Sequence, residues 1–122
     1  MPRHLLSEDA IDPSIRDAIS ASHRPVVEEV QAAVAAHDVV VVGMKQNPFP
    51  RKARKALAAA GIPFHYQEYG SYLSTWRPRT ALKMWTGWPT FPMVFVKGVL
   101  VGGAQETMAL IESGELAKRL GK

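Results

Sequence analysis

Cysteine is missing from this chain: none of its 122 residues is one. Without a thiol the chain itself forms no disulfide, no zinc–thiolate site and no cysteine-ligated iron–sulfur cluster. It also has no thiol nucleophile, so it performs no thiol–disulfide exchange of its own. The usual sequence clue to the redox compartment is absent as well.

Long hydrophobic runs are missing too. The longest strongly apolar run, residues 39–44, is far shorter than the ~20 residues of a membrane-spanning helix. Residues 1–9 contain no apolar core of an export signal, because charged and polar side chains interrupt them. We therefore expect no membrane partner and a cytoplasmic location.

Neither sign of charge dominates. Fifteen Lys and Arg residues against eleven Asp and Glu residues give a net charge of +4, and 47% of the residues are hydrophobic. This is the composition of one folded domain with a weak preference for anionic partners. Because no aromatic residues are interleaved with the basic run at residues 51–55, we expect no nucleic-acid partner.

Signature motifs of common enzyme and cofactor classes are also lacking. The sequence has no GxGxxG, P-loop or GxSxG motif. Its histidines, His4, His23, His37 and His65, lack the spacing of metal ligands. We therefore expect no metal site, no resident cofactor and no catalytic residue.

Hydrophobic periodicity predicts alternating helices and strands in residues 25–122, after an N-terminal extension, 1–24, with one short helix near 13–21. Four consecutive valines from Val39 to Val42 predict a strand buried on both faces. Lys97-Gly98 fits a two-residue hairpin turn. We expect helices near 25–37, 47–60, 79–85, 106–111 and 115–120, and strands at 39–44, 62–69, 92–96 and 99–101.

The order of these elements predicts the fold class. A strand–helix–strand start requires a parallel pair with a right-handed crossover, whereas the final hairpin is antiparallel. The expected α/β fold is therefore a four-stranded mixed sheet with helices on both faces, which is the thioredoxin-like layout.

Three segments resemble a known family. Trp88-Pro89-Thr90-Phe91-Pro92, Val94-Phe95-Val96-Lys97-Gly98 and Val101-Gly102-Gly103 resemble the WPT-x-P, V-x-G and VGG signature of glutaredoxins, most of all the monothiol class. Arg79, Leu82-Lys83 and Met44-Lys45 have similar counterparts there. The resemblance covers about residues 26–120 and implies the glutaredoxin form of the thioredoxin-like fold.

The family's active-site motif is replaced. Asn47-Pro48-Phe49-Pro50 stands where dithiol glutaredoxins have CPYC, with Asn47 at the nucleophile position and Pro50 at the resolving one. A second alignment deletes the cysteine altogether. From the residues alone, Asn47 and Pro48 suit a helix N-cap and first turn. A helix start that still attracts an anion is the other interpretation.

The resemblance also implies a glutathione-binding set. Lys45 and Arg79 would hold the glycine carboxylate, and the backbone at a cis Phe91–Pro92 bond would pair with the cysteine residue of glutathione. The turn after the double glycine would take the γ-glutamyl end, where Gln105 lacks the charge of the family's Asp. That loss removes a charge-assisted bond of roughly 1.5–3 kcal/mol. The full predicted set is Lys45, Phe49, Arg79, Phe91, Pro92, Gly103, Ala104 and Gln105.

Arg51-Lys52-Ala53-Arg54-Lys55 forms a basic run on the helix that follows. It is either a solvated face or a docking site for a carboxylate, a phosphate or an acidic protein. Among the tryptophans, we expect Trp85 in the core, Trp88 beside the site loop and Trp76 in a loop that could anchor a partner.

These observations predict a redox-inactive glutaredoxin-like module that binds glutathione, another small anionic peptide or a protein partner. The alternative is an enzyme in which bound glutathione supplies the thiol.

Overall fold

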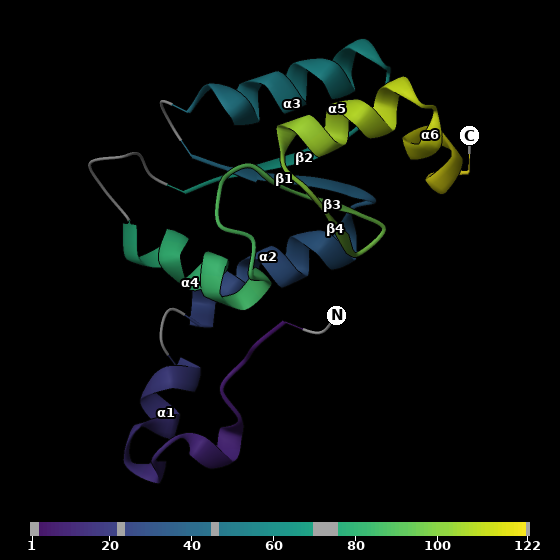
Figure 1. Cartoon of the computed structure of the whole chain (residues 1–122). Helices are drawn as coiled ribbons and strands as arrows, with labels where there is room; N and C mark the ends of the chain where they lie inside the picture. The colour runs from purple at the N-terminus through teal and green to yellow at the C-terminus, as the bar shows by residue number, and fades with distance from the viewer. Residues whose placement is uncertain (1–2, 22–23, 45–46, 70–75, 122) are drawn as a thin grey trace.

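The computed structural model describes residues 3–21, 24–44, 47–69 and 76–121, without the side chains of 19–21 and 76–78. Within these ranges every predicted helix and strand is present (Figure 1). In chain order the elements are η1 Glu8–Ala10, α1 Pro13–Ala21, α2 Arg24–Ala36, β1 Val39–Gly43, α3 Pro48–Ala59, β2 His65–Glu68, α4 Trp76–Thr86, β3 Met93–Val96, β4 Val99–Gly102, α5 Ala104–Glu112 and α6 Glu115–Arg119.

The four strands form one mixed sheet in the order β2-β1-β3-β4. Strand β1 pairs in parallel with β2, with Val40 opposite His65, and antiparallel with β3, with Val40 opposite Phe95. Strands β3 and β4 are antiparallel. The predicted mixed sheet and thioredoxin-like class are therefore confirmed.

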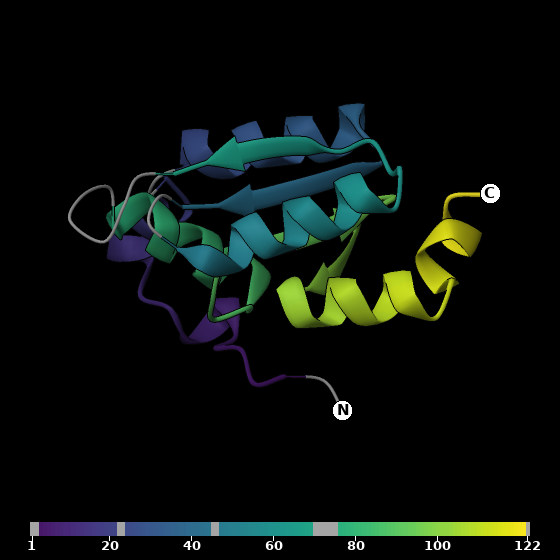
Figure 2. The same cartoon turned by 90° about the horizontal axis from the view of Figure 1, so that it is seen from above.

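Strand β1 is buried along its whole length because helices cover both faces of the sheet. Val40 and Val42 pack in a core with α2 and α4, whereas Val39 and Val41 pack in a second core with α3 and α6. Figures 1 and 2 show α3 and α5 side by side on one face and α2 with α4 on the other. A strand buried on both faces needs no alternation of polar residues, which explains the valine run.

Three element starts differ from the prediction by two residues or more. Helix α4 begins at Trp76 rather than near residue 79. Strand β2 starts at His65 rather than at residue 62, because the Ile62 N–H donates to Leu57 O at 3.0 Å and closes the end of α3. Helix α5 starts at Ala104 rather than near 106, because Gly103 already serves as its N-cap. The Lys97-Gly98 hairpin turn is confirmed, and both residues have positive φ, 51° and 82°.

The N-terminal extension projects from the α2–α4 side of the domain (Figure 1). In this extension, Nη1 of Arg3 donates to Thr86 O at 2.7 Å. Thr86 ends α4, and the C-terminal end of a helix favours a cation. Leu5, Leu6 and Ile15 are 69%, 72% and 50% exposed, respectively. The domain boundary at residue 24 stays a prediction. None of the helices in the described ranges has the length and apolar character to cross a bilayer.

Candidate functional site

Three segments that are distant in sequence meet at one end of the sheet. They are the start of α3 at Asn47, the Phe91–Pro92 segment before β3 and the turn from β4 into α5 at Gly103. The Phe91–Pro92 bond is cis, as the resemblance implied. Asn47 Nδ2 donates to Phe91 O at 3.4 Å, and Pro92 O lies 3.5 Å from where a Cβ on Gly103 would be. The structure thus brings these predicted site residues together.

Asn47 is the N-cap of α3, as predicted, and its Oδ1 accepts from Phe49 N at 2.9 Å. Pro48 and Pro50 have no N–H. The first three helical positions therefore offer no free backbone donor to an anion. The helix dipole remains, but the hydrogen bonds that make a helix start a good anion site do not.

Pro50 is buried and packs against the end of β1. A Cβ added to Gly43 would lie 2.8 Å from Pro50 Cβ and 3.0 Å from Tyr66 Cε1, so the close approach requires glycine there. The resolving-cysteine position is thus filled by a packing residue. Phe49, by contrast, is 52% exposed, and Lys52 Nζ lies 5.3 Å from the centroid of its ring.

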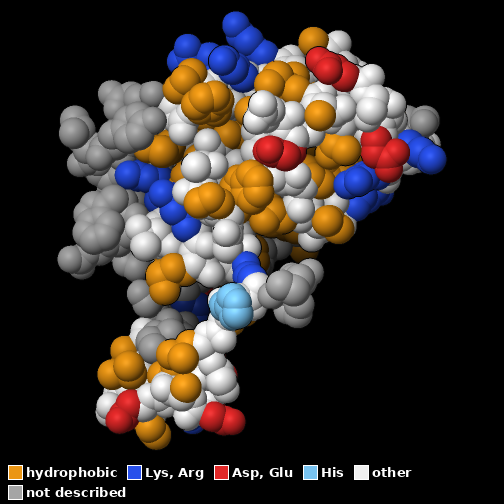
Figure 3. Space-filling model, in the orientation of Figure 1, with side chains coloured by type: hydrophobic (Ala, Val, Ile, Leu, Met, Phe, Trp, Pro, Cys, Tyr) orange, Lys and Arg blue, Asp and Glu red, His pale blue; other side chains and the backbone are white. Residues whose placement is uncertain are grey.

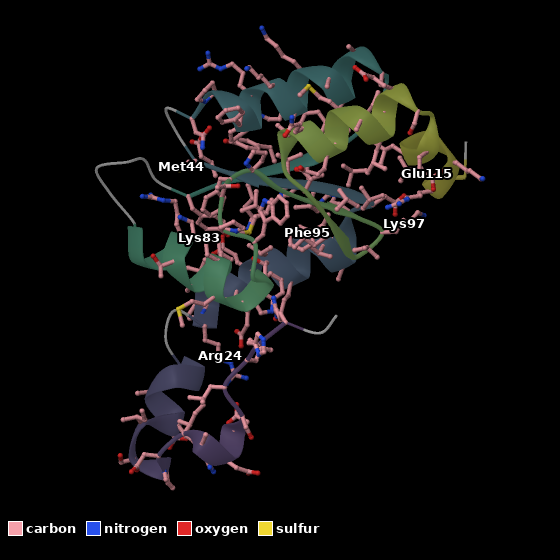
Figure 4. All side chains as sticks on the ribbon, in the orientation of Figure 1. Arg24, Met44, Lys83, Phe95, Lys97 and Glu115 are labelled. Carbon is pink, nitrogen blue, oxygen red and sulfur yellow. The ribbon has the colours of Figure 1, made fainter. Side chains whose placement is uncertain are left out.

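Helix α4 supplies the positive charge on the other side of Phe91. Arg79 is only 7% exposed and its Nη1 donates to Tyr69 O at 3.4 Å. Lys83 lies one turn further along α4, with its Nζ 5.8 Å from the centroid of the Phe91 ring. Figure 4 shows Lys83 on the same side of the molecule as Met44 at the end of β1. Lys45, the other predicted cation, lies outside the described residues.

Lys83 was not among the predicted site residues. Its spacing of four residues from Arg79 places both cations on one helix face, and that spacing was the signal available in the sequence.

The turn into α5 holds a carboxylate that the prediction also missed. Gly103 N donates to Glu106 Oε1 at 2.8 Å, so the side chain of Glu106 folds back over the double glycine. Ala104 is buried at the first position of α5, whereas Gln105 is exposed. An acid three residues after an N-cap is a capping-box pattern, which was readable from the sequence.

Trp88 packs beside this turn, as expected. Its Nε1 lies 3.6 Å from the position of a Cβ on Gly103. That nitrogen is buried and has no hydrogen-bond partner within the part of the chain that the structure describes. Trp85 packs against the core near Phe95, with ring centroids 6.0 Å apart. Trp76 was expected in a loop, and this was wrong, because α4 already begins at Trp76; its side chain lies outside the described residues.

The basic run on α3 is only partly a solvated face. Arg51, Lys52 and Lys55 are exposed, but the guanidinium of Arg54 lies 3.9 Å from the centroid of the Tyr66 ring. This is cation–π geometry. Burial and the hydrogen bond from Tyr66 Oη to Glu68 Oε1, 2.9 Å long, raise the pKa of Tyr66 to about 12.

The histidines make no metal cluster in the described ranges, where no group of three or more potential ligands comes together. His37 and His65 instead stack, with ring centroids 4.4 Å apart. They lie at the opposite end of β1 from Asn47, because His65 is opposite Val40 and His37 precedes Val39.

Comparison with known proteins finds glutaredoxins, both as a family model and as individual relatives. The glutaredoxin family model matches residues 39–101. A glutaredoxin-like protein of Dictyostelium discoideum is 43% identical over 109 residues, 89% of each chain, and glutaredoxin-C4 of Arabidopsis thaliana is 31% identical over 102 residues, 84% of this chain and 76% of that protein.

Solved structures agree in fold. Oxidized glutaredoxin 2 from Chlamydomonas reinhardtii superposes with a TM-score of 0.70 at 29% identity, over 82% of this chain and 94% of that one. A wheat glutaredoxin also has a TM-score of 0.70, at 30% identity, over 82% of this chain and 96% of its own. The family match includes the strand before Asn47, the replaced motif and the Phe91–Pro92 segment, and so this chain, although it has no cysteine, belongs to the glutaredoxin family.

Proposed function

We propose that this protein binds glutathione, or another small anionic peptide, between Asn47, Phe91 and Gly103, and that it acts as a binding or regulatory module without thiol chemistry of its own. The observation that carries the proposal is the contact between Asn47 Nδ2 and Phe91 O, 3.4 Å. It keeps the start of α3 beside the Phe91–Pro92 segment although the reactive thiol is gone.

Each part of such a ligand has a matching group. Lys83 places positive charge over the Phe91 ring, and Arg79 lies one turn before it on α4, so this helix would meet a carboxylate of the peptide. The carbonyl oxygen of Phe91 has two lone pairs. Asn47 Nδ2 donates to one of them, so the other can accept from a backbone N–H of the peptide. At the start of α5 the Gly103 N–H is engaged by Glu106, so the α-carboxylate of the γ-glutamyl end would use the N–H groups that follow it and the positive dipole end.

The alternative is an enzyme in which bound glutathione supplies the thiol. Such chemistry needs a group that activates sulfur, and its pKa must suit proton transfer. Asn47, Phe49, Pro50, Phe91 and Pro92 have no titratable side chain. The titratable groups nearby are engaged elsewhere, Lys83 over the Phe91 ring and Glu106 with the Gly103 N–H. Binding without turnover is therefore the better supported function.

Titration calorimetry with reduced glutathione tests the proposal, with S-methylglutathione as the matched ligand. We expect both to bind with similar affinity, because no step uses the thiol. Arg79→Ala should weaken binding by about 1.5–3 kcal/mol, as the loss of a charged hydrogen bond does. The exposed Lys55→Ala should change binding by less than about 1 kcal/mol.

Three results would contradict the proposal. One is the absence of heat with either ligand, and another is a larger effect of Lys55→Ala than of Arg79→Ala, which would place the anion on the helix face. The third is turnover above the glutathione-only background in a hydroxyethyl-disulfide assay, which would favour the enzyme.

A further inference from the structure

The described residues contain two charged surfaces of opposite sign. The first, which we call the acidic arm, is formed by Glu8, Asp9 and Asp12 at η1 and the start of α1. All three are exposed. Four of the eleven acidic residues of the chain fall between residues 8 and 17, where Arg16 is the single basic residue. The arm therefore has negative charge in a chain whose net charge is +4.

The second surface, the basic face, is formed by Arg51, Lys52 and Lys55 on α3. These side chains are exposed, and α3 contains no acidic residue. No salt bridge neutralises the basic face among the described residues, where the ion pairs are Arg24–Glu28, Lys97–Asp38 and Arg119–Glu115. Glu8, Asp9 and Asp12 have no ion pair among the described residues either, because Arg16 donates to the backbone carbonyls of Glu8 and Ile11 and not to these three carboxylates.

Exposed apolar side chains accompany both surfaces. Leu5, Leu6 and Ile15 of the extension are at least half exposed, and so is Phe49 beside the basic face, at 52%. Large apolar groups rimmed by charge are typical of protein–protein contacts. The two surfaces are therefore complementary in chemistry, with opposite charge around apolar groups.

The arm cannot meet the basic face of its own chain in this fold. The extension projects from the α2–α4 side, whereas α3 covers the other face of the sheet (Figure 1). Figure 3 shows acidic side chains at the free end of the arm and a cluster of basic side chains at the far end of the molecule, over α3. The complementary surface that is always present at equal concentration is therefore on a second copy.

We propose that the acidic arm of one copy docks on the basic face of α3 of another copy, so that the protein self-associates head to tail. Such a contact joins two different surfaces, so each copy still offers a free arm and a free basic face. Association then either closes into a ring of copies or continues as an open filament. Because the arm is small and its charges are solvated, the contact is weak and sensitive to salt.

Sedimentation velocity of the full chain over a range of protein concentrations tests this, at about 0.01 M and about 1 M ionic strength, where the Debye length is ~30 Å and ~3 Å. We expect the sedimentation coefficient to rise with concentration at low salt and to stay constant at high salt. One variant, Glu8→Lys/Asp9→Lys, makes the arm basic; another, Arg51→Glu/Lys52→Glu/Lys55→Glu, makes the α3 face acidic. Asp12 is left in place because its carboxylate accepts from Ser14 N at the start of α1.

Each variant alone should remain monomeric, because its arm and its α3 face then have the same sign. An equal mixture of the two should associate again, since each arm meets an opposite charge on the other variant. Glu112→Lys and Lys118→Glu, at exposed positions outside both surfaces, are the matched controls and should behave like the unmodified chain. Circular dichroism checks that each variant is folded.

Monomeric behaviour of the unmodified chain at low salt would overturn the proposal, and so would a control that abolishes association. If only the α3 variant abolishes association, the basic face binds an acid other than the arm, which also overturns it. If each variant is monomeric but the mixture fails to associate, the two surfaces do not contact each other.

Discussion

Asn47 and Phe91, 44 residues apart in the chain, are joined by a hydrogen bond from Asn47 Nδ2 to Phe91 O at 3.4 Å. The same asparagine caps α3 through its Oδ1. One side chain thus fixes the helix start and ties it to the Phe91–Pro92 segment. The position at which the family has its nucleophile is a structural link in this protein.

The first prediction concerns these two bonds. Asn47→Ala should lower the free energy of unfolding by about 0.5–2 kcal/mol, the usual loss when an N-cap is removed. Asn47→Ser should lose less, because serine still accepts from Phe49 N but has no amide to reach Phe91. Urea unfolding measures both variants. Equal losses would show that the cap contributes little and the link to Phe91 most of the effect.

A thiol introduced at this position should be a poor thiolate site. In Asn47→Cys the helix dipole lowers the thiol pKa below the ordinary ~8.5, but Pro48 and Pro50 provide no N–H to the sulfur. Adding Pro50→Ala supplies one N–H at the third helical position, so the thiol pKa should fall further. Ultraviolet absorbance of the thiolate against pH compares the two. Identical titrations would mean that backbone donors do not control the site.

The pKa of Tyr66 predicts a loss of stability at alkaline pH. It is raised to about 12, whereas tyrosine in the unfolded chain has a pKa of ~10. Below pH ~10 both states keep the proton and the stabilisation is fully present. As the pH rises from about 10 to about 12, the unfolded chain releases the proton first, so stability falls.

Thermal unfolding over this pH range measures the effect. Tyr66→Phe has no phenol to titrate, so its stability should fall less steeply than that of the unmodified chain. Lysines titrate in both proteins and cancel in the comparison. Parallel curves would show that Tyr66 does not contribute to the alkaline loss.

Gln105→Asp should strengthen glutathione binding by about 1.5–3 kcal/mol, because it adds a charge-assisted bond to the ammonium of the γ-glutamyl end. Calorimetry with N-acetylglutathione is the control, since this ligand has no ammonium and should show no gain. If Glu106 already serves the ammonium, Gln105→Asp will change little and Glu106→Gln will weaken binding instead.

Much of the fold could be predicted because its signals are local. The helix at 13–21, the cap at Asn47 and the hairpin at Lys97-Gly98 follow from caps, periodicity and turn residues that are neighbours in the chain. The valine run identified the central strand, because only a strand covered on both faces lacks alternation. The WPT-x-P and VGG segments identified two of the three segments that meet at one end of the sheet.

Other features could not be read in this way. Arg54 belongs to a basic run that reads as a solvated face, but it stacks on Tyr66 because the parallel pairing of β1 with β2 brings that ring beside α3. Lys83 and Glu106 each had a local sequence signal, but only the tertiary structure places them beside Phe91 and Gly103.

The sequence by itself determined that this protein has no thiol, which residues form helices and strands, and which segments carry the family's signature. These properties depend on residue identity and on neighbours within a few positions. The tertiary structure alone decided that Asn47 reaches Phe91, that Arg79 is buried and that the acidic arm and the basic face lie on opposite sides of the sheet. Those contacts depend on strand order and on how helices pack across the sheet, which no local pattern specifies.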